Sequence, residues 1–250
     1  MTTTLIVGAT GMTGYRLVEQ LLDAKHKVRV VVRSPDKFSA ETLNNPNMTV
    51  VDARLLDLSD EELAVQVKGC NAVVSCLGHT LDFNGMFGSP RKLCTDATRR
   101  LCKAIDINHP GEPTKFILMN TVAVQNPDCR EKRKWFERGL LSLLHHGVPP
   151  HLDNETAAEH LHQCVGKNNP HIQWCIVRPD SLINAEVSAY DIEESPITGI
   201  FGGRPTTRSN VAHFMSELIE NAEIWDTWKF RMPVIMNSVE RHQPTIGISG

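Results

Sequence analysis

Three glycines with fixed spacing, Gly8, Gly11 and Gly14, stand in the run Gly-Ala-Thr-Gly-Met-Thr-Gly near the start of the chain. The first permits a tight turn, the second lets the backbone approach a pyrophosphate, and the third allows a helix to pack closely on a strand. The start of that helix would present unpaired N–H groups and a positive dipole end to phosphates. The run therefore predicts a phosphate cradle, with a tight turn that binds nothing as the alternative. The predicted binding residues here are Gly8, Thr10, Gly11, Met12, Thr13 and Gly14.

The elements that must position this turn alternate between short β-branched runs and helical patterns. We expect strands over residues 4–7, 27–32, 48–51, 72–76, 115–120 and 172–177. We expect helices over residues 12–24, 58–67, 90–107, 132–146, 153–165 and 209–221. This order predicts an α/β fold of the Rossmann type, a doubly wound parallel sheet with helices on both faces. Ligands of such a sheet bind beyond the carboxyl ends of its strands.

The second half of the chain is less regular. The Gly-Val-Pro-Pro run at 147–150 is expected to end one helix, and Asp153 or Asn154 to cap the next. No linker separates two autonomous units. We therefore expect one domain over residues 1–250, in which residues 178–240 form a small C-terminal lobe on the substrate side.

Composition excludes several classes of protein. The chain has 250 residues, 41% of them hydrophobic, and a net charge of −3, so it lacks the basic surface of a nucleic-acid binder. It contains no apolar run of membrane-spanning length and no signal-peptide pattern, so we expect a cytoplasmic protein. The seven cysteines form no CxxC pair and are expected to be reduced thiols of the core. No His or Cys spacing matches a metal site, and we expect none.

The end of the second expected strand indicates which nucleotide the cradle holds. In dinucleotide-binding folds an Asp or Glu at this place bonds the adenosine ribose of NAD. This chain has Arg33 instead, which could pair with a 2′-phosphate through two hydrogen bonds, followed by Ser34 and Lys37. We therefore predict NADP(H) as the cofactor, with Arg33 and Ser34 among its ligands. A solvated surface charge is the alternative for Arg33.

The Gly-Ala-Thr-Gly form resembles the atypical branch of the short-chain dehydrogenases/reductases. Active members usually carry Tyr-x-x-x-Lys on a helix, where the Tyr moves a proton and the Lys lowers its pKa. The two tyrosines of this chain, Tyr15 and Tyr190, have no Lys four residues later. The resemblance aligns His151 with the Tyr and Glu155 with the Lys. A carboxylate cannot perform the cationic role, so the usual dehydrogenase mechanism is not implied.

The overall pattern is similar to the flavin reductase/biliverdin reductase B and NmrA-like group, over roughly residues 3–235. The segments that carry the similarity are GATGMTG at 8–14, the Val-Val-Arg end of the second strand, SCLG at 75–78, NTVAV at 120–124, CIVRPDSL at 175–182 and NVAHFM at 210–215. In biliverdin reductase B-like proteins hydride passes to a planar acceptor, near a Ser or Thr after the fifth strand. The resemblance implies catalytic roles for Thr121 and for Asp180, which could relay a proton. The alternatives are a turn-capping Thr and a turn or N-cap Asp.

The same resemblance implies further contacts with the cofactor. They are Cys76, Leu77 and Gly78 after the fourth strand, Asn120 beside Thr121, and Pro179 beside the nicotinamide. Either Asp52 or Asp57 could meet the adenine. Trp135 and Phe136 could border the acceptor pocket or belong to the core or an interface, and residues 130–133 are expected to form a solvated helical face.

Three functions are compatible with these features. The first is an NADP(H)-dependent oxidoreductase that transfers hydride to a small planar acceptor such as a flavin, tetrapyrrole or quinone. The alternative is a non-catalytic, NmrA-like sensor that binds NADP(H) and signals through protein contacts. A third is a biosynthetic reductase or isomerase that uses His151 or His79 as an unusual acid–base residue. The expected partner is a small-molecule acceptor, not nucleic acid or membrane, and the chain is expected to be a monomer or a homodimer.

Overall fold

The computed structural model describes residues 1–78, 91–129, 131, 149–196 and 204–239, and its centre is an eight-stranded sheet. The strand order is β3-β2-β1-β4-β5-β6-β10-β8, and a separate pair is formed by β7 and β9. The strands are β1 (Thr3–Val7), β2 (Lys27–Val32), β3 (Met48–Asp52), β4 (Ala72–Ser75), β5 (Thr114–Met119), β6 (Ile172–Pro179), β7 (Leu182–Ile183), β8 (Tyr190–Glu193), β9 (Thr206–Thr207) and β10 (Val234–Asn237). Only the β10–β8 pair of the described sheet is antiparallel. The expected doubly wound parallel sheet is confirmed.

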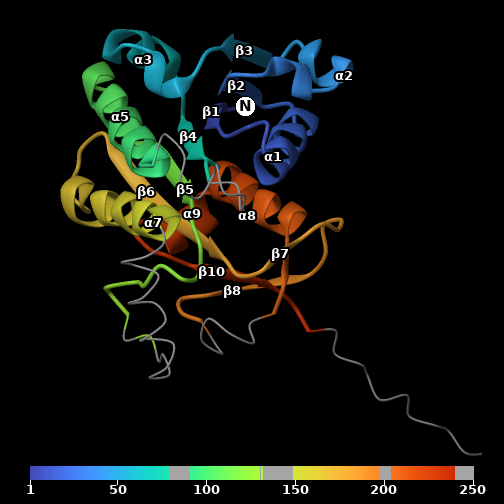
Figure 1. Cartoon of the computed structure of the whole chain (residues 1–250), viewed down its shortest axis with the longest axis vertical. Coiled ribbons are helices and arrows are strands. Elements are labelled where there is room, and N and C mark those ends of the chain that lie inside the picture. The colour runs from blue at the N-terminus through green and yellow to red at the C-terminus, as the bar shows by residue number, and fades with distance from the viewer. Residues whose placement is uncertain (79–90, 130, 132–148, 197–203, 240–250) are drawn as a thin grey trace, which may run out of the picture.

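Helices cover both faces of this sheet (Figure 1). They are α1 (Met12–Asp23), α2 (Ala40–Leu43), α3 (Asp60–Val67), α5 (Leu93–Asn108), α7 (Pro149–Glu159), α8 (Arg208–Glu220) and α9 (Ala222–Trp228). Short helical segments are η1 (Pro35–Lys37), η2 (Leu55–Asp57) and the π-helical η3 (His160–Val165). One face carries α3, α5 and α7, and the other carries α1, α8 and α9, with α1 packed against α8.

Alternate residues of the central strands supply the two halves of the core. In β1, Leu5 and Val7 pack into the cluster beneath α3, α5 and α7, whereas Ile6 packs into the cluster beneath α1 and α8. Successive side chains of a strand point to opposite faces, so a strand covered on both sides must be apolar throughout. This is why the strands of the first half appear in the sequence as continuous apolar runs.

The register aligns the carboxyl ends of the central strands. Val7 pairs with both Val31 and Ser75, Ser75 pairs with Leu118, and Leu118 pairs with Ile176. The segments that follow β1, β2, β4, β5 and β6 therefore emerge along one edge of the sheet, which we call the carboxyl edge. Apart from the adenine candidates Asp52 and Asp57, the predicted cofactor and catalytic residues lie in these segments or at the last residue of β6.

One expectation for the second half is wrong. Helix α7 begins at Pro149 and not at residue 153, so Asp153 and Asn154 lie within it and neither is its N-cap. A proline is tolerated in a first helical turn because the N–H that it lacks would have no partner in the helix there. The helix expected over 132–146 and the tail after 240 lie outside the described residues.

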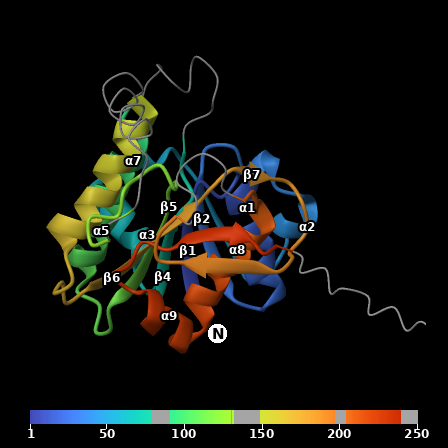
Figure 2. The same ribbon diagram turned by 90° about the horizontal axis from the view of Figure 1, so that it is seen from below.

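The predicted C-terminal lobe contributes to the main sheet and to its covering layer. Strands β10 and β8 extend the sheet beyond β6 and run side by side in Figure 2. Helices α8 and α9 pack on the face that α1 also covers. The sequence patterns do not predict β8, β10 or α9, because each is short, at four to seven residues, and the two strands are held by partners distant in sequence. Within the described ranges, no helix is both long and apolar enough to cross a membrane.

Candidate nucleotide site

The glycine turn joins β1 to α1 with little space to spare. Gly8 has a φ of +72°, and a Cβ atom there would lie 2.5 Å from the Cys76 carbonyl carbon. A Cβ atom on Gly14 would lie 2.4 Å from the Gly8 oxygen, whereas one on Gly11 would lie 3.2 Å from it. The predicted tight turn at Gly8 and close helix–strand packing at Gly14 are thus confirmed. The pyrophosphate contact of Gly11 stays a prediction.

The start of α1 has the features of an anion site. Its N-cap is Gly11, and no side chain in the described structure caps it. Its first turn contains no acidic residue, and Met12 is 56% exposed. Free N–H groups at a helix start, without a resident carboxylate, favour binding of a phosphate.

A second helix start at the same edge is already occupied by the protein. The buried Asp153 carboxylate accepts hydrogen bonds from Cys94 N at 2.8 Å and from Thr95 N at 2.9 Å. Thr95 Oγ1 in turn donates to the Asp153 backbone oxygen at 3.0 Å. Asp153 therefore caps α5 from within α7, which is the function that the sequence had suggested for its own helix. A carboxylate at the start of α5 excludes a phosphate. Of these two helix starts, only that of α1 is therefore open to a phosphate.

Arg33 directly follows the end of β2 and is an exposed cation. Within the described parts of the chain, no hydrogen bond or ion pair engages its guanidinium. Ser34 is the N-cap of η1, and the following loop is packed on α1 by the Tyr15–Phe38 ring pair, whose centroids are 5.5 Å apart. A partnerless guanidinium on a positioned loop is suited to a ligand phosphate.

The two candidate adenine contacts lie on neighbouring segments. Asp52 is the last residue of β3 and pairs in register with Val32, the residue before Arg33. Asp57 lies further along, in η2. Both carboxylates are exposed, and the choice between them stays open.

The segment after β4 lies directly against the glycine turn. Cys76 N donates to Val7 O at 2.9 Å, and the buried Cys76 thiol has its pKa raised to about 12 because burial disfavours its charged form. Gly78 is exposed, and none of the described residues lies within 4 Å of a Cβ built on it. The Cys76 thiol is therefore neutral and buried, and the cofactor contacts of Cys76 and Gly78 stay predictions. His79 lies outside the described residues.

The residues after β5 form a turn that is held by side-chain hydrogen bonds. Asn120 accepts from Thr121 N through Oδ1 at 2.9 Å and donates through Nδ2 to Asn154 O in α7, also at 2.9 Å. Thr121 Oγ1 accepts from Ala123 N at 3.3 Å. The Asn120 side chain thus links the turn to α7, and the Thr121 hydroxyl caps the turn while keeping its own proton for a further acceptor.

The end of β6 lies against this turn. Val122 N donates to Pro179 O at 3.1 Å, which joins the residue after Thr121 to the residue before Asp180. Asp180 Oδ1 accepts from Ser181 N at 2.7 Å. Burial raises the pKa of Asp180, although the hydrogen bonds from Ser181 act in the opposite direction. The fold therefore brings the two predicted catalytic residues to one place on the carboxyl edge.

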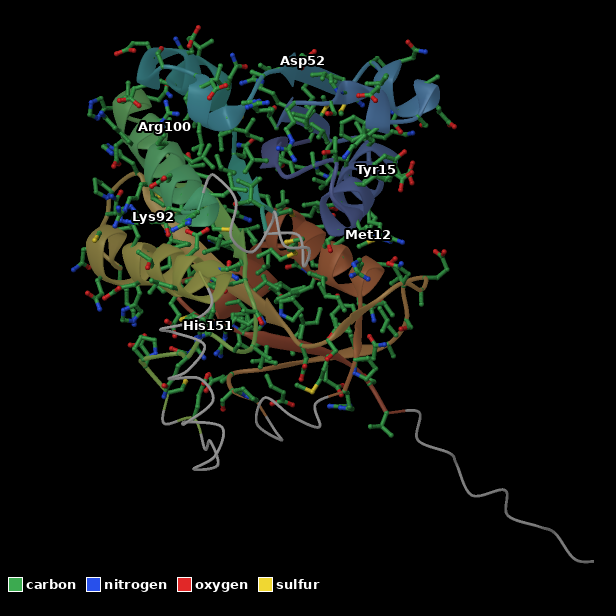
Figure 3. The ribbon with its side chains drawn as sticks, in the orientation of Figure 1. Met12, Tyr15, Asp52, Lys92, Arg100 and His151 are labelled. Atoms are coloured by element: carbon green, nitrogen blue, oxygen red, sulfur yellow. The ribbon has the colours of Figure 1, made fainter. Side chains whose placement is uncertain are left out.

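The residues aligned with the missing Tyr and Lys interact with each other. In α7 the Nε2 atom of buried His151 lies 3.3 Å from Glu155 Oε1. Figure 3 labels His151 in α7 and Met12 in α1, which cover opposite faces of the sheet.

The two tyrosines of the chain are bonded elsewhere in the fold. Tyr15 OH accepts a hydrogen bond from Ser39 N. Tyr190 OH lies 2.8 Å from His213 Nδ1, and burial raises the pKa of Tyr190 to about 12. Both phenol oxygens therefore have hydrogen-bond partners within the chain.

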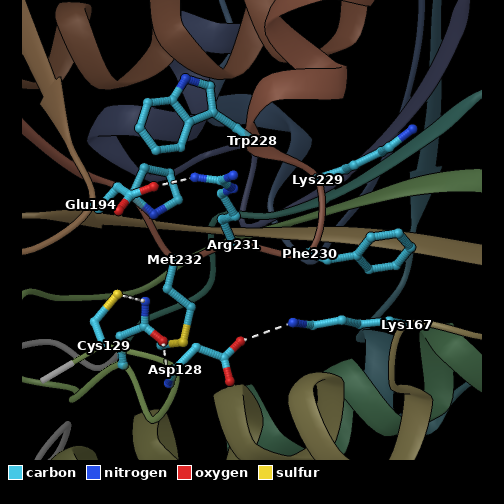
Figure 4. A pocket seen from close by; sticks show the side chains of 11 residues that line it. Asp128, Cys129, Lys167, Glu194, Trp228, Lys229, Phe230, Arg231 and Met232 are labelled. Carbon is cyan, nitrogen blue, oxygen red and sulfur yellow. Dashed lines mark hydrogen bonds and ion pairs between the residues drawn. The ribbon is translucent and has the colours of Figure 1, made fainter.

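A pocket of about 310 Å³ lies away from these residues, next to the segment that leads into β10 (Figure 4). Two ion pairs lie within it, Lys167 with Asp128 at 3.1 Å and Arg231 with Glu194, while Lys229 pairs with Asp226 outside the lining. The described residues that line it include none of the predicted site residues. In the part of the chain that the structure describes, no group of three or more metal-binding side chains occurs.

The sequence patterns do not show that two charged residues, Asp153 and Arg178, are buried. Arg178 lies in β6 with 0% of its side chain exposed. It forms an ion pair with Glu131 at 2.6 Å. Glu131 is only 1% exposed, so its expected place on a solvated face is wrong. The available signal was a charged residue inside the apolar run Cys-Ile-Val-Arg-Pro, because a charge in a buried strand requires a partner.

Comparisons with known proteins show the family and the fold of the chain. The chain matches the model of an NAD(P)H-binding family over residues 8–222. A curated relative, an uncharacterised chloroplastic protein of Arabidopsis thaliana, is 29% identical over 119 residues, which are 48% of this chain and 41% of that protein. The match thus spans well under half of that relative's length.

Solved structures share the fold at low identity. An oxidoreductase from Lactococcus lactis is 19% identical with a TM-score of 0.67, over 94% of this chain and 91% of its own. A short-chain dehydrogenase/reductase from Veillonella parvula in complex with NADP is 14% identical with a TM-score of 0.68, over 94% of each chain. A proposed NADH-flavin reductase from Streptococcus pneumoniae is 17% identical with a TM-score of 0.64, over 95% of this chain and 100% of its own.

The family match begins at Gly8 and includes the uncapped start of α1, the β2 end and the turns after β4, β5 and β6. These are the parts that a Rossmann fold uses to hold a dinucleotide. The chain belongs to the NAD(P)H-binding family.

Proposed function

We propose that the protein is an NADP(H)-dependent reductase that passes a hydride to a small planar acceptor, such as a flavin, tetrapyrrole or quinone. One observation carries the preference for NADP(H). Arg33, at the end of β2 beside the glycine turn, is an exposed guanidinium that the described protein leaves without a partner. A 2′-phosphate is the group of NADP(H) that such a fork recognises.

The acceptor half of the proposal depends on Thr121 and Asp180. Bound NADPH would supply the hydride. Thr121 offers a hydroxyl proton beside the acceptor, and the raised pKa of Asp180 increases the fraction of this carboxyl group that can donate a proton. A conjugated acceptor spreads the charge that it gains, so it depends less on a Tyr–Lys pair than a simple ketone does. The proposed activity of the Streptococcus pneumoniae protein supports this class of acceptor.

A second candidate is a sensor that binds NADP(H) without turnover. It is supported by the hydrogen bonds that Asn120, Thr121 and Asp180 make as turn-forming groups of the chain itself. In this case the three side chains shape a binding surface and transfer no proton.

Steady-state oxidation of NADPH separates these functions. The purified protein is mixed with NADPH or NADH and with a panel of flavins, quinones, a linear tetrapyrrole and simple carbonyl compounds. Turnover with a planar acceptor, faster with NADPH than with NADH, supports the reductase. Tight NADPH binding without turnover on the panel supports the sensor and contradicts the reductase.

The Gly11→Val variant is the matched control for this experiment. Its side chain would stand where the pyrophosphate must approach, 3.2 Å from the Gly8 oxygen at its Cβ atom. Turnover that survives in Gly11→Val at the wild-type rate would belong to a contaminant or to another site.

A further inference from the structure

Arg178 is a fully buried cation whose guanidinium is bonded on several sides. Its Nε donates to Met232 O at 2.8 Å, and its Nη2 donates to Glu194 O at 3.2 Å. Its Nη1 donates both to Val124 O at 2.8 Å and to Glu131 Oε1 at 2.6 Å. Such a charge is tolerated inside a protein only when its partners are well placed. The guanidinium therefore fixes three separate backbone segments around β6.

One of these segments is the turn that carries Thr121. Val124, whose oxygen accepts from Arg178, donates its own N–H to Thr121 O at 3.1 Å. Glu131 Oε1 accepts from Asn126 N at 3.3 Å while it also binds Arg178. Arg178 thus binds this segment at Val124, whose N–H closes the turn on Thr121, and Glu131 binds the same segment at Asn126.

The other predicted catalytic residue follows Arg178 by two positions. Arg178 N donates to Pro233 O at 2.8 Å, and Pro179 O accepts from Val122 N at 3.1 Å. The strand end that carries Asp180 is therefore held by the same residue. We propose that Arg178, held by Glu131, is a positioning residue that fixes Thr121 relative to Asp180. This inference rests on the proposed reductase function.

The surface pocket shown in Figure 4 supplies a control on the same segment. Asp128 lies between Asn126 and Glu131, is 43% exposed, and pairs with Lys167 at 3.1 Å and His162 at 2.9 Å. Asp128→Asn removes one negative charge from this segment, as Glu131→Gln does, but leaves the bonds of Arg178 intact. The two variants thus differ in whether the positioning pair is broken.

The kinetic test compares Glu131→Gln with Asp128→Asn. We expect Glu131→Gln to lower kcat by about ten- to a hundredfold, because small misplacements of reacting groups reduce rates on this scale. The Kd for NADPH should change much less than kcat, since the glycine turn and Arg33 lie elsewhere and only Asn120 and Pro179 of the predicted cofactor contacts adjoin this turn. Asp128→Asn should keep kcat within about twofold. Equal losses in the two variants would overturn the proposal.

A combined variant distinguishes positioning from general damage. If Arg178 and Glu131 act through Thr121, Glu131→Gln should reduce kcat much less in a Thr121→Ala background than in the wild-type chain. A loss of the same factor in both backgrounds overturns the proposal. Arg178→Lys is the second variant should Glu131→Gln fail to fold. It keeps the charge but loses the planar fork, and should show the same dependence on Thr121.

Amide hydrogen exchange tests the inference without turnover. Glu131→Gln should speed exchange in peptides that contain Val122, Val124 and Asn126, and leave peptides from β1 to β3 unchanged. Faster exchange throughout the chain, or none in this turn, overturns the proposal. If the wild-type chain shows no turnover, the proposed function fails, while the exchange result still decides whether the pair holds the turn.

Discussion

The carboxyl edge of the sheet has two regions, which differ in whether their polar groups have hydrogen-bond partners within the chain. The cofactor region, residues 8–14 with Arg33, leaves the start of α1 uncapped and the guanidinium without a partner among the described residues. The acceptor region, residues 120–124 with Pro179 and Asp180, bonds its polar side chains to the chain itself. An uncapped helix start and a cation without a protein partner are groups that a phosphate can satisfy, whereas the bonds of Asn120, Thr121 and Asp180 fit a scaffold as well as a proton donor. The nucleotide is therefore easier to infer than its acceptor.

The largest expected effect concerns the close contact that shapes the cofactor region. Gly8→Ala should lower the free energy of unfolding by about 2–5 kcal/mol, because it adds left-handed backbone strain to a steric overlap. The overlap is with Cys76, whose carbonyl carbon would lie 2.5 Å from the new Cβ atom. Chemical denaturation measures the change.

Gly69→Ala is the matched control for Gly8→Ala. Gly69 has a φ of +75°, but no atom of the described residues lies within 4 Å of a Cβ built on it. Only the backbone strain remains, so the loss should be about 1–2 kcal/mol. Equal losses at the two glycines would mean that close packing against the segment after β4 contributes nothing.

The next effect tests the open cation of the cofactor region. Arg33→Asp should weaken NADPH binding by about ten- to a hundredfold, because it removes a charged, hydrogen-bonded contact with the 2′-phosphate. NADH binding should change much less. Titration calorimetry with both cofactors measures this, and equal affinities of the parent protein for NADPH and NADH would refute the assignment.

A third effect compares two candidate proton sources for the acceptor region. Thr121→Ala should reduce kcat more than the double change of His151→Ala with Glu155→Ala, which should leave above about a tenth of kcat. If His151 acts as the general acid, the double change should instead reduce kcat by about a hundredfold or more. His151 is buried, so thermal unfolding must first show that the double variant is folded.

The smallest effect is a dependence on pH. Burial raises the pKa of Asp180, so the protonated carboxyl stabilises the fold at low pH. This contribution is lost as pH rises from about 4, the ordinary value for Asp, through the raised pKa. Relative to Asp180→Asn, the wild-type chain should lose less than about 1 kcal/mol of stability across this window.

The activity should follow the same titration if Asp180 donates the proton. The kcat/KM of the wild-type chain then falls as pH rises through that pKa, and Asp180→Asn lacks this limb of the profile. An unchanged profile in Asp180→Asn would assign the titration to another group.

Local patterns predicted much of the fold. The strands before residue 120 lie within a residue or two of their expected bounds, because each contains an apolar run and those in the middle of the sheet are covered on both faces. The glycine turn was equally predictable, since φ at Gly8 and packing at Gly14 depend on residues a few positions apart. Strand β10 and helix α9 were not, because both are short and β10 pairs with strands that are distant in sequence.

The sequence by itself determined the doubly wound sheet, the tight glycine turn and the cation at the end of β2. The sheet follows from the order of the elements, and the turn and the cation follow from spacing within single segments, where backbone geometry alone relates one residue to the next. Only the tertiary structure decided that Asp153 caps α5 and that Arg178 pairs with Glu131. The paired residues are 58 to 59 and 47 positions apart. No local rule connects them, so the need of a buried charge for a partner is satisfied only once the helices and strands have packed.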